Sequence, residues 1–134
     1  MWKEMETGAS GGGGGTADLL WDNPNKNTGK GATTFTQSDL LKSLSNYTHI
    51  LVYSKAQATV TPSTDYEIGY SLIPIDGNSY YAWGGVSSSS ARYRSYQIIN
   101  STIVMGNGIY SGTASENACL PLQIFGVNLT LASS

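Results

Sequence analysis

The residue types that enzymes use for proton transfer and nucleophilic attack are few and scattered in this chain. His49 is the only histidine, and no Gly-x-Ser-x-Gly turn accompanies it, so the sequence does not indicate a Ser-His-Asp hydrolase. Asp65 and Glu67 lie two residues apart and would share one face of a strand, as a pair of glycosidase carboxylates can. Such same-face carboxylates are mostly solvated. We therefore predict that the protein is not an enzyme.

The two residues with the softest ligand atoms are equally isolated. Cys119 is the only cysteine, which excludes an intrachain disulfide, and its neighbours Ala118 and Leu120 predict that it is buried. One cysteine and one histidine cannot supply the ligand set of a transition-metal site within a single chain. We predict no metal and no cofactor.

Aromatic residues are the strongest indication of a binding surface. The chain has nine tyrosines, and the stretch from residue 66 to residue 96 contains Tyr66, Tyr70, Tyr80, Tyr81, Trp83, Arg92, Tyr93, Arg94 and Tyr96. Exposed rings beside polar groups can stack on the apolar face of a pyranose, so this set is a candidate glycan or partner surface. Tyrosine is also favoured in strands, where its ring fills sandwich interiors and subunit interfaces. We favour the second interpretation and keep the first as the alternative.

Residues 1–17 differ in composition from the rest of the chain. The heptapeptide MWKEMET is followed by Gly-Ala-Ser and then by five consecutive glycines, Gly11 to Gly15. Five glycines cannot hold regular structure against their backbone entropy, so they predict a flexible tether. A phosphate-binding loop is not indicated, because it needs a Gly-Lys-Ser/Thr sequence that the chain lacks. At the tip, Trp2 and Met5 form a candidate docking peptide; the alternative is a merely disordered terminus.

Charge excludes several classes of partner. The formal net charge is -2, and the seven Lys and Arg residues are scattered, so no basic stripe indicates nucleic acid binding. The sequence has no apolar run long enough to span a membrane, and residues 1–6 lack the apolar core of a secretory signal. Charged residues make up only 12% of the chain, which is typical of surfaces that neighbouring subunits cover. We predict a symmetric homo-oligomer.

The remainder, residues 18–134, has the pattern of a single all-β domain. Short β-branched and aromatic runs recur at intervals of roughly ten residues between turn clusters, which predicts an antiparallel, jelly-roll-like β-sandwich. A proline near the start of the last run, Pro121, indicates an edge strand or a bulge. Residues 38–44 are the only helix candidate: one or two helical turns, with Ser38 or Asp39 as N-cap and three leucines on one side. We expect strands at 19–21, 32–37, 48–54, 65–75, 79–83, 91–99, 102–105, 109–111 and 120–131. Gly106-Asn107-Gly108 is expected to form a turn between two of them. Alternation along the strand at 91–99 places Tyr93 on the face opposite to Arg92 and Arg94.

Several of these runs resemble a known kind of module. Residues 19–24 (LLWDNP), Phe35 and residues 47–53 (YTHILVY) are similar to the opening of small modules in phage tail, fibre and other minor structural proteins. Arg92 to Ile99, the Gly106-Asn107-Gly108 segment and residues 119–127 (CLPLQIFGV) are similar to the closing part of the same modules. The likeness covers nearly all of residues 18–127, although the glycine-rich tether and residues 128–134 depart from it.

The resemblance implies a bacteriophage virion structural protein, such as a capsid decoration protein, a head fibre or a tail fibre component. It implies a trimeric sandwich without catalytic residues, made in the host cytoplasm and carried on the particle surface. In that setting Trp2 and Met5 become candidate particle-docking residues, and the tyrosine-rich strands become a candidate surface for host attachment through glycans.

Overall fold

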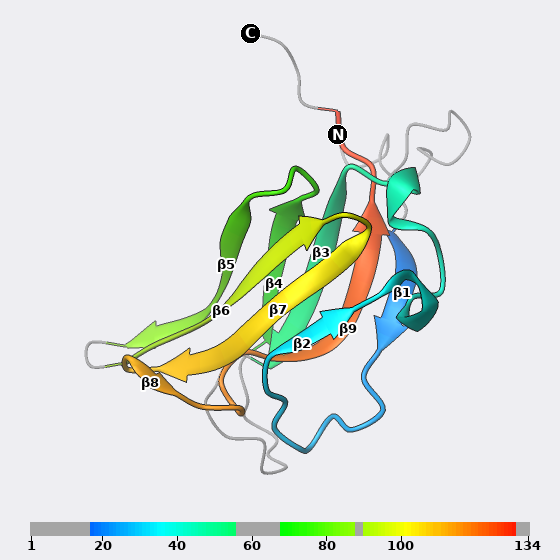
Figure 1. The fold of residues 1–134 in the computed structure, drawn as a ribbon. Helices are drawn as coiled ribbons and strands as arrows, with labels where there is room; N and C mark the ends of the chain where they lie inside the picture. Colours follow the sequence, from blue (N-terminus) through cyan, green and yellow to red (C-terminus); the bar gives the residue numbers. More distant parts are fainter. Residues whose placement is uncertain (1–16, 56–67, 88–89, 131–134) are drawn as a thin grey trace, which may run out of the picture.

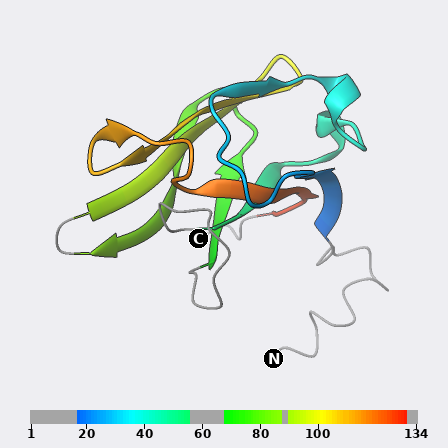
Figure 2. The same cartoon turned by 90° about the horizontal axis from the view of Figure 1, so that it is seen from below.

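The described part of the chain forms two antiparallel sheets packed face to face (Figures 1 and 2). The structure, a computed structural model, describes residues 17–55, 68–87 and 90–130. Sheet A has the order β1-β9-β3-β4 and contains β1 (Ala17–Asp22), β9 (Leu120–Val127), β3 (His49–Lys55) and β4 (Ile68–Pro74). Sheet B has the order β2-β7-β6-β5, with β8 paired to β7, and contains β2 (Thr33–Phe35), β7 (Thr102–Tyr110), β6 (Ser90–Ile99), β5 (Ser79–Ser87) and β8 (Thr113–Ala114). The predicted antiparallel β-sandwich is confirmed.

The connections explain why neighbouring candidate residues end up in different sheets. β3 and β4 form a hairpin in sheet A, whereas β5, β6 and β7 form a meander in sheet B. Between them, a short turn from Ile75 to Asn78 joins the edge strand of one sheet to the edge strand of the other. The β6–β7 hairpin turns at Asn100 and Ser101, whose φ angles of 52° and 61° suit a tight hairpin turn. The tyrosine-rich stretch therefore spans both layers.

The core lies between the sheets and follows the period of two that strands impose. Alternate residues of each strand point inward, so that Ile50 and Val52 of β3 and Tyr96 and Ile98 of β6 are all buried. The other buried apolar members of this core are Leu20, Phe35, Leu40, Leu44, Ile73, Ala82, Ile103, Met105 and Ile124. Trp21 closes one side of it, with its ring 4.9 Å from that of Phe35 in an edge-to-face contact.

Pro121 marks a bulge, as one of the two sequence interpretations predicted. Tyr53 pairs with Gln123 and Ser54 pairs with Pro121, so β9 carries one extra residue opposite β3. The alternative, an edge strand, is wrong, because β9 lies between β1 and β3. A bulge accommodates a residue that lacks the backbone N–H of the ladder.

The segment 38–44, for which one or two helical turns were predicted, contains no α-helix. Two short 3₁₀ turns lie at its ends, Gln37–Asp39 and Leu44–Asn46, and the backbone at Leu40 is extended. The N–H of Leu41 donates to the carbonyl of Leu20 in β1 instead of to a carbonyl one turn back. Leu40 and Leu44 enter the core while Leu41 is exposed, so the three leucines do not share one side. A tertiary hydrogen bond and split leucine burial thus override a weak local helix preference.

The prediction that Gly106-Asn107-Gly108 forms a turn is also wrong, since these residues lie inside the single strand β7. Arg94 of β6 pairs with Gly108 and Tyr96 pairs with Met105, which leaves one extra residue on β7 and makes a bulge there. A β-carbon at position 108 would collide with backbone oxygens of the segment that follows β8. The glycine is required by this close approach of backbone rather than by a turn.

Candidate functional site

Three of the predicted surface aromatics form a cluster on the outer face of sheet B. Tyr81 and Trp83 of β5 and Tyr93 of β6 have ring centroids 4.8 to 6.0 Å apart, in tilted and edge-to-face arrangements. Their partner residues across the ladder explain the direction of these rings. Trp83 pairs with Tyr93, and the alternate positions Ala82 and Arg94, which pair with each other, are buried.

This aromatic cluster, defined as Tyr81, Trp83 and Tyr93, presents flat apolar surface to solvent. The exposed fractions of Tyr81 and Trp83 are 56% and 51%. Next to it, Ser95 pairs with Tyr81 and supplies a hydroxyl on the same face, since directly paired residues share a face. Rings bordered by hydroxyl groups have the chemistry needed to stack on a sugar or on a partner's side chain.

Arg94, which was predicted to belong to the same surface, is completely buried. Its guanidinium donates from all five N–H groups to backbone carbonyls, namely those of Lys30, Gly106, Glu116, Ala118 and Cys119, at 2.7 to 3.1 Å. Burial lowers the pKa of Arg94 from its ordinary value, yet a guanidinium remains charged well above neutral pH. Arg94 therefore ties three separate segments together and cannot take part in surface binding.

Tyr96 is the second correction, because its side chain is also fully buried. Desolvation raises the pKa of its hydroxyl, and the neighbouring Arg94 charge acts in the opposite direction. No described residue forms a hydrogen bond with that hydroxyl. Tyr96 is a core residue of β6, in agreement with the interpretation that strands recruit tyrosine to fill interiors.

The other predicted surface residues are spread over the molecule. Tyr70 lies on the outer face of sheet A, 65% exposed, and stacks on Tyr53 at 4.9 Å. Tyr80 points toward the core rim, and its hydroxyl donates to Asp76 at 2.5 Å, which raises the pKa of Tyr80. Arg92 places its guanidinium 5.5 Å from the ring centre of Tyr110. Tyr66, Trp2 and Met5 lie outside the described residues.

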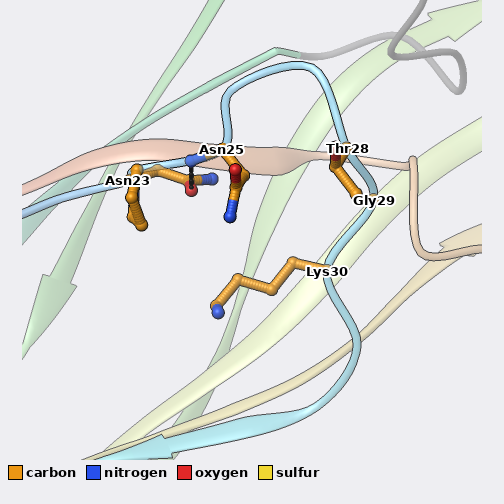
Figure 3. A pocket seen from close by; sticks show the side chains of 6 residues that line it. Asn23, Asn25, Thr28, Gly29 and Lys30 are labelled. Carbon is orange, nitrogen blue, oxygen red and sulfur yellow. Dashed lines mark hydrogen bonds between the residues drawn. The ribbon is translucent and has the colours of Figure 1, made fainter.

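A second, smaller site follows β1. Asn23, Pro24, Asn25, Thr28, Gly29 and Lys30 line a pocket of about 90 Å³. Asn23 holds the loop in shape, because its buried amide donates to the Pro121 carbonyl at 2.8 Å and its side-chain oxygen accepts the N–H of Asn25 at 2.7 Å. In Figure 3 the side chains of Asn25 and Lys30 both extend inside the curve of the loop. The Lys30 ammonium lies 5.5 Å from the ring centre of Trp21. The pocket is well below the usual size of a ligand site.

An apolar row that was not predicted from the sequence crosses the outer face of sheet A. Leu19, Phe125, Leu51 and Leu72 are successive partners across β1, β9, β3 and β4. The neighbours of Leu51 along its strand, Ile50 and Val52, are buried in the core, so this row faces away from it. One side of an antiparallel sheet is ordinarily polar. The signal in the sequence is the continuous apolar run of residues 50–53, which places apolar side chains on both faces of a strand.

The described ranges contain no group of three or more His, Cys, Asp or Glu side chains that could hold a metal ion. They also contain no helix long and apolar enough to cross a membrane. His49 hydrogen bonds through its Nδ1 to the adjacent Thr48 hydroxyl at 2.7 Å. The predicted pair Asp65 and Glu67 lies outside the described residues. Cys119 is buried, as predicted.

Comparisons with protein-family models, curated proteins and solved structures found no match to this chain.

Proposed function

We propose that this chain is a structural protein of a bacteriophage particle, either a capsid decoration protein or a component of a head or tail fibre. In this role it acts without catalysis, through rigid shape and contacts with other virion proteins. The proposal starts from the sequence resemblance and is supported by the two-layer antiparallel fold, which suits such modules.

The observation that carries the proposal is that hydrogen bonds join the segments behind the resemblance in the fold. Arg94 binds the carbonyls of Gly106 and Cys119, which lie in two separate motif segments. Asn23, from the opening motif, binds the carbonyl of Pro121 in the closing motif. Residues 98 positions apart in the chain thereby depend on each other.

Assembly is part of the proposal. The low charge of the chain and its exposed aromatic and aliphatic side chains favour lateral burial in a homo-oligomer, for which the resemblance implies a trimer. Trp2 and Met5 serve as docking groups for the particle. Light scattering of the purified chain should give three times the monomer mass at micromolar concentration, and a monomer mass would contradict the trimer.

The virion role is tested on intact particles. Mass spectrometry and density reconstruction of particles purified from a culture that produces this chain should find it in many copies on the particle surface. Particles made with a chain that lacks residues 1–7 should carry fewer copies if Trp2 and Met5 dock it. Absence of the chain from purified particles would exclude a structural role.

A second candidate function is recognition of host-surface glycans, and the convergence of Tyr81, Trp83 and Tyr93 favours it. Binding to a glycan array should depend on this cluster, so Trp83→Ala should abolish it. Tyr70→Ala is the matched control, because Tyr70 is similarly exposed but belongs to the other sheet. Equal loss with both variants would show that binding does not use the cluster.

A further inference from the structure

The outer face of sheet B around the aromatic cluster is uncharged. Directly paired and alternate residues share a face, so the face of Tyr81, Trp83 and Tyr93 continues through their neighbours on β5, β6 and β7. These neighbours are Ser79, Ser95, Gln97, Val104 and Ile109. None of them carries a charge, and Arg94, which follows Tyr93, is fully buried. A charged ligand would therefore meet no opposite charge among these described side chains.

The same face offers hydrogen-bonding groups that the fold does not use. Within the described part of the chain, the hydroxyls of Tyr81, Tyr93 and Ser95 have no hydrogen-bond partner. The Ser95 hydroxyl lies over Gly106, where a β-carbon would displace it. A hydroxyl both donates and accepts, as the hydroxyls of a sugar do. The face is thus complementary to an uncharged sugar, and not to a carboxylate, a sulfate or a phosphate.

The three rings of the cluster do not lie in one plane. The ring of Tyr81 is inclined by 66° to that of Trp83 and by 74° to that of Tyr93, and these two are inclined by 46° to each other. A flat stretch of polysaccharide needs coplanar rings spaced along it. Here the centroids are only 4.8 to 6.0 Å apart, so one pyranose covers them together. In the described fold β5 is the edge strand of sheet B, so the aromatic surface ends there.

We propose that the aromatic cluster binds a single uncharged pyranose and discriminates against acidic sugars and against extended stretches of polysaccharide. The sugar stacks on Trp83, and its hydroxyls bond with those of Tyr81, Tyr93 and Ser95. The inference rests on the glycan-recognition function proposed above and names the ligand class of that site. With one stacked ring and few hydrogen bonds, we expect a Kd of about 1 mM for a monosaccharide.

The first experiment titrates the whole chain with monosaccharides and follows binding by saturation-transfer NMR. The probes are the methyl glycosides of galactose, glucose, mannose and N-acetylglucosamine. At least one should bind, and its Kd should not change between about 0.05 and 0.5 M NaCl, because no charge pairing is involved. The matched acids, methyl galacturonide and methyl glucuronide, should bind at least about tenfold more weakly than methyl galactoside and methyl glucoside, since each adds a carboxylate that must lose water without a partner.

A second titration uses linear oligosaccharides of two to four units of the sugar that binds best. Their Kd should stay within about threefold of the monosaccharide value, because sugars beyond the first find no further ring to stack on. A site for an extended chain would instead gain affinity with each added sugar.

Two variants separate binding from folding. Ser95→Ala removes one hydroxyl beside the cluster and should weaken monosaccharide binding about threefold to tenfold, with an unchanged melting temperature. Thr34→Ala is the matched control, because Thr34 pairs with Val104 on the same face but lies on β2, two strands from Ser95. It should leave the Kd unchanged.

Four outcomes would overturn the inference. Uronides that bind as tightly as the neutral glycosides mean that the face does not exclude charge, and affinity that rises with chain length means that the site is extended. Equal Kd values for Ser95→Ala and Thr34→Ala mean that the cluster hydroxyls do not contact the sugar. Binding to a glycan array without binding to any of the monosaccharides contradicts the inference alone, whereas absence of binding to both also contradicts glycan recognition itself.

Discussion

Tyr93 and Arg94 are adjacent in the chain, and the structure assigns them to opposite kinds of environment. Tyr93 joins the aromatic cluster on the outer face of sheet B, with its ring 4.8 Å from that of Trp83. Arg94 points inward and is completely enclosed by backbone carbonyls. On a strand, the odd or even position of a residue therefore decides whether its side chain faces solvent, where it can bind a partner, or the interior, where it supports the fold.

The two environments also differ in how strongly they constrain their residues. The lock around Arg94 consists of Arg94, Asn23, Gly108 and the carbonyls they approach, and every polar atom of the guanidinium is used. In the aromatic cluster, the rings touch one another but leave about half of Tyr81 and Trp83 open to solvent. Substitutions in the lock should therefore change stability, and those in the cluster should change binding.

The largest effect is expected for Arg94→Ala. Removal of the guanidinium leaves a cavity and takes the side-chain donor from five carbonyls, of which those of Ala118 and Cys119 lie in buried hydrogen bonds. Each buried unsatisfied group costs about 1 to 3 kcal/mol. Because water can enter and some groups can relax, we expect a loss of about 4 kcal/mol or more in the free energy of unfolding, measured by urea denaturation. Arg94→Lys should recover only part of it, since an ammonium has three donors instead of five.

A surface ion pair provides the control for that experiment. Lys42 lies 3.7 Å from Asp18, and both side chains are substantially exposed. Lys42→Ala should cost about 0.5 kcal/mol or less. If Arg94→Ala lowered the free energy of unfolding no more than Lys42→Ala does, the hydrogen bonds of the buried guanidinium would stabilise the fold no more than a surface ion pair.

The alternation of side chains along strands also determined how much of the molecule could be predicted from its sequence. The strands from residues 48–54 and 91–99 agree closely with β3 and β6, because their alternation and turn boundaries are local. The opposite directions of Tyr93 and Arg94 followed from the same alternation. Which of the two directions faced the core did not follow, because that depends on which sheet each strand packs against.

The incorrect predictions have a common physical cause in backbone contacts between distant segments. Gly106 and Gly108 were predicted to form a turn. A glycine in a turn and a glycine in a strand that another backbone approaches closely look the same in the sequence. The segment 38–44 was interpreted as a helix because the bond from Leu41 to Leu20 cannot be foreseen from either segment alone. The three cluster residues were predicted only as members of a larger set. Tyr70 is separated from them because it lies in sheet A, and Tyr80 and Tyr96 because they occupy the alternate, inward-facing positions of β5 and β6.

The next effect in size is expected for Gly108→Ala. The new β-carbon would collide with the carbonyl oxygens of Ser115 and Ala118 and lie 2.8 Å from Nη2 of Arg94. Backbone must shift to relieve these contacts, so we expect a loss of about 2 to 3 kcal/mol in the free energy of unfolding. Gly31→Ala is the matched control, because its β-carbon would meet only the mobile end of the Glu116 side chain, and it should cost less than about 1 kcal/mol. Equal melting temperatures for both variants would contradict the close approach.

A smaller loss is expected for Asn23→Ala. Asn23 is buried, and the substitution removes its donor to the Pro121 carbonyl and its acceptor for the N–H of Asn25. We expect a cost of about 1 to 2 kcal/mol, with increased hydrogen exchange at Asn25. Asn25→Ala changes a side chain that is exposed and should be close to neutral. A neutral Asn23→Ala would mean that the loop is held by its backbone bond to Leu122 alone.

The smallest effect on stability, and the largest on recognition, is expected for Trp83→Ala. About half of the Trp83 surface is already exposed, so the substitution removes less buried area than a core substitution would. Its two ring contacts, with Tyr81 and Tyr93, contribute about 0.5 kcal/mol each, the low end for aromatic pairs, because the rings are half in water. Urea denaturation should therefore detect a change of about 1 kcal/mol, while binding to any glycan that the chain recognises should disappear. Trp83→Phe keeps a flat ring and should retain part of the binding, because stacking on a pyranose needs ring area more than the indole N–H. A destabilisation by Trp83→Ala comparable to that of Gly108→Ala would mean that the cluster stabilises the fold. Tyr93 and Arg94, on the two sides of β6, would then differ only in their exposure to solvent.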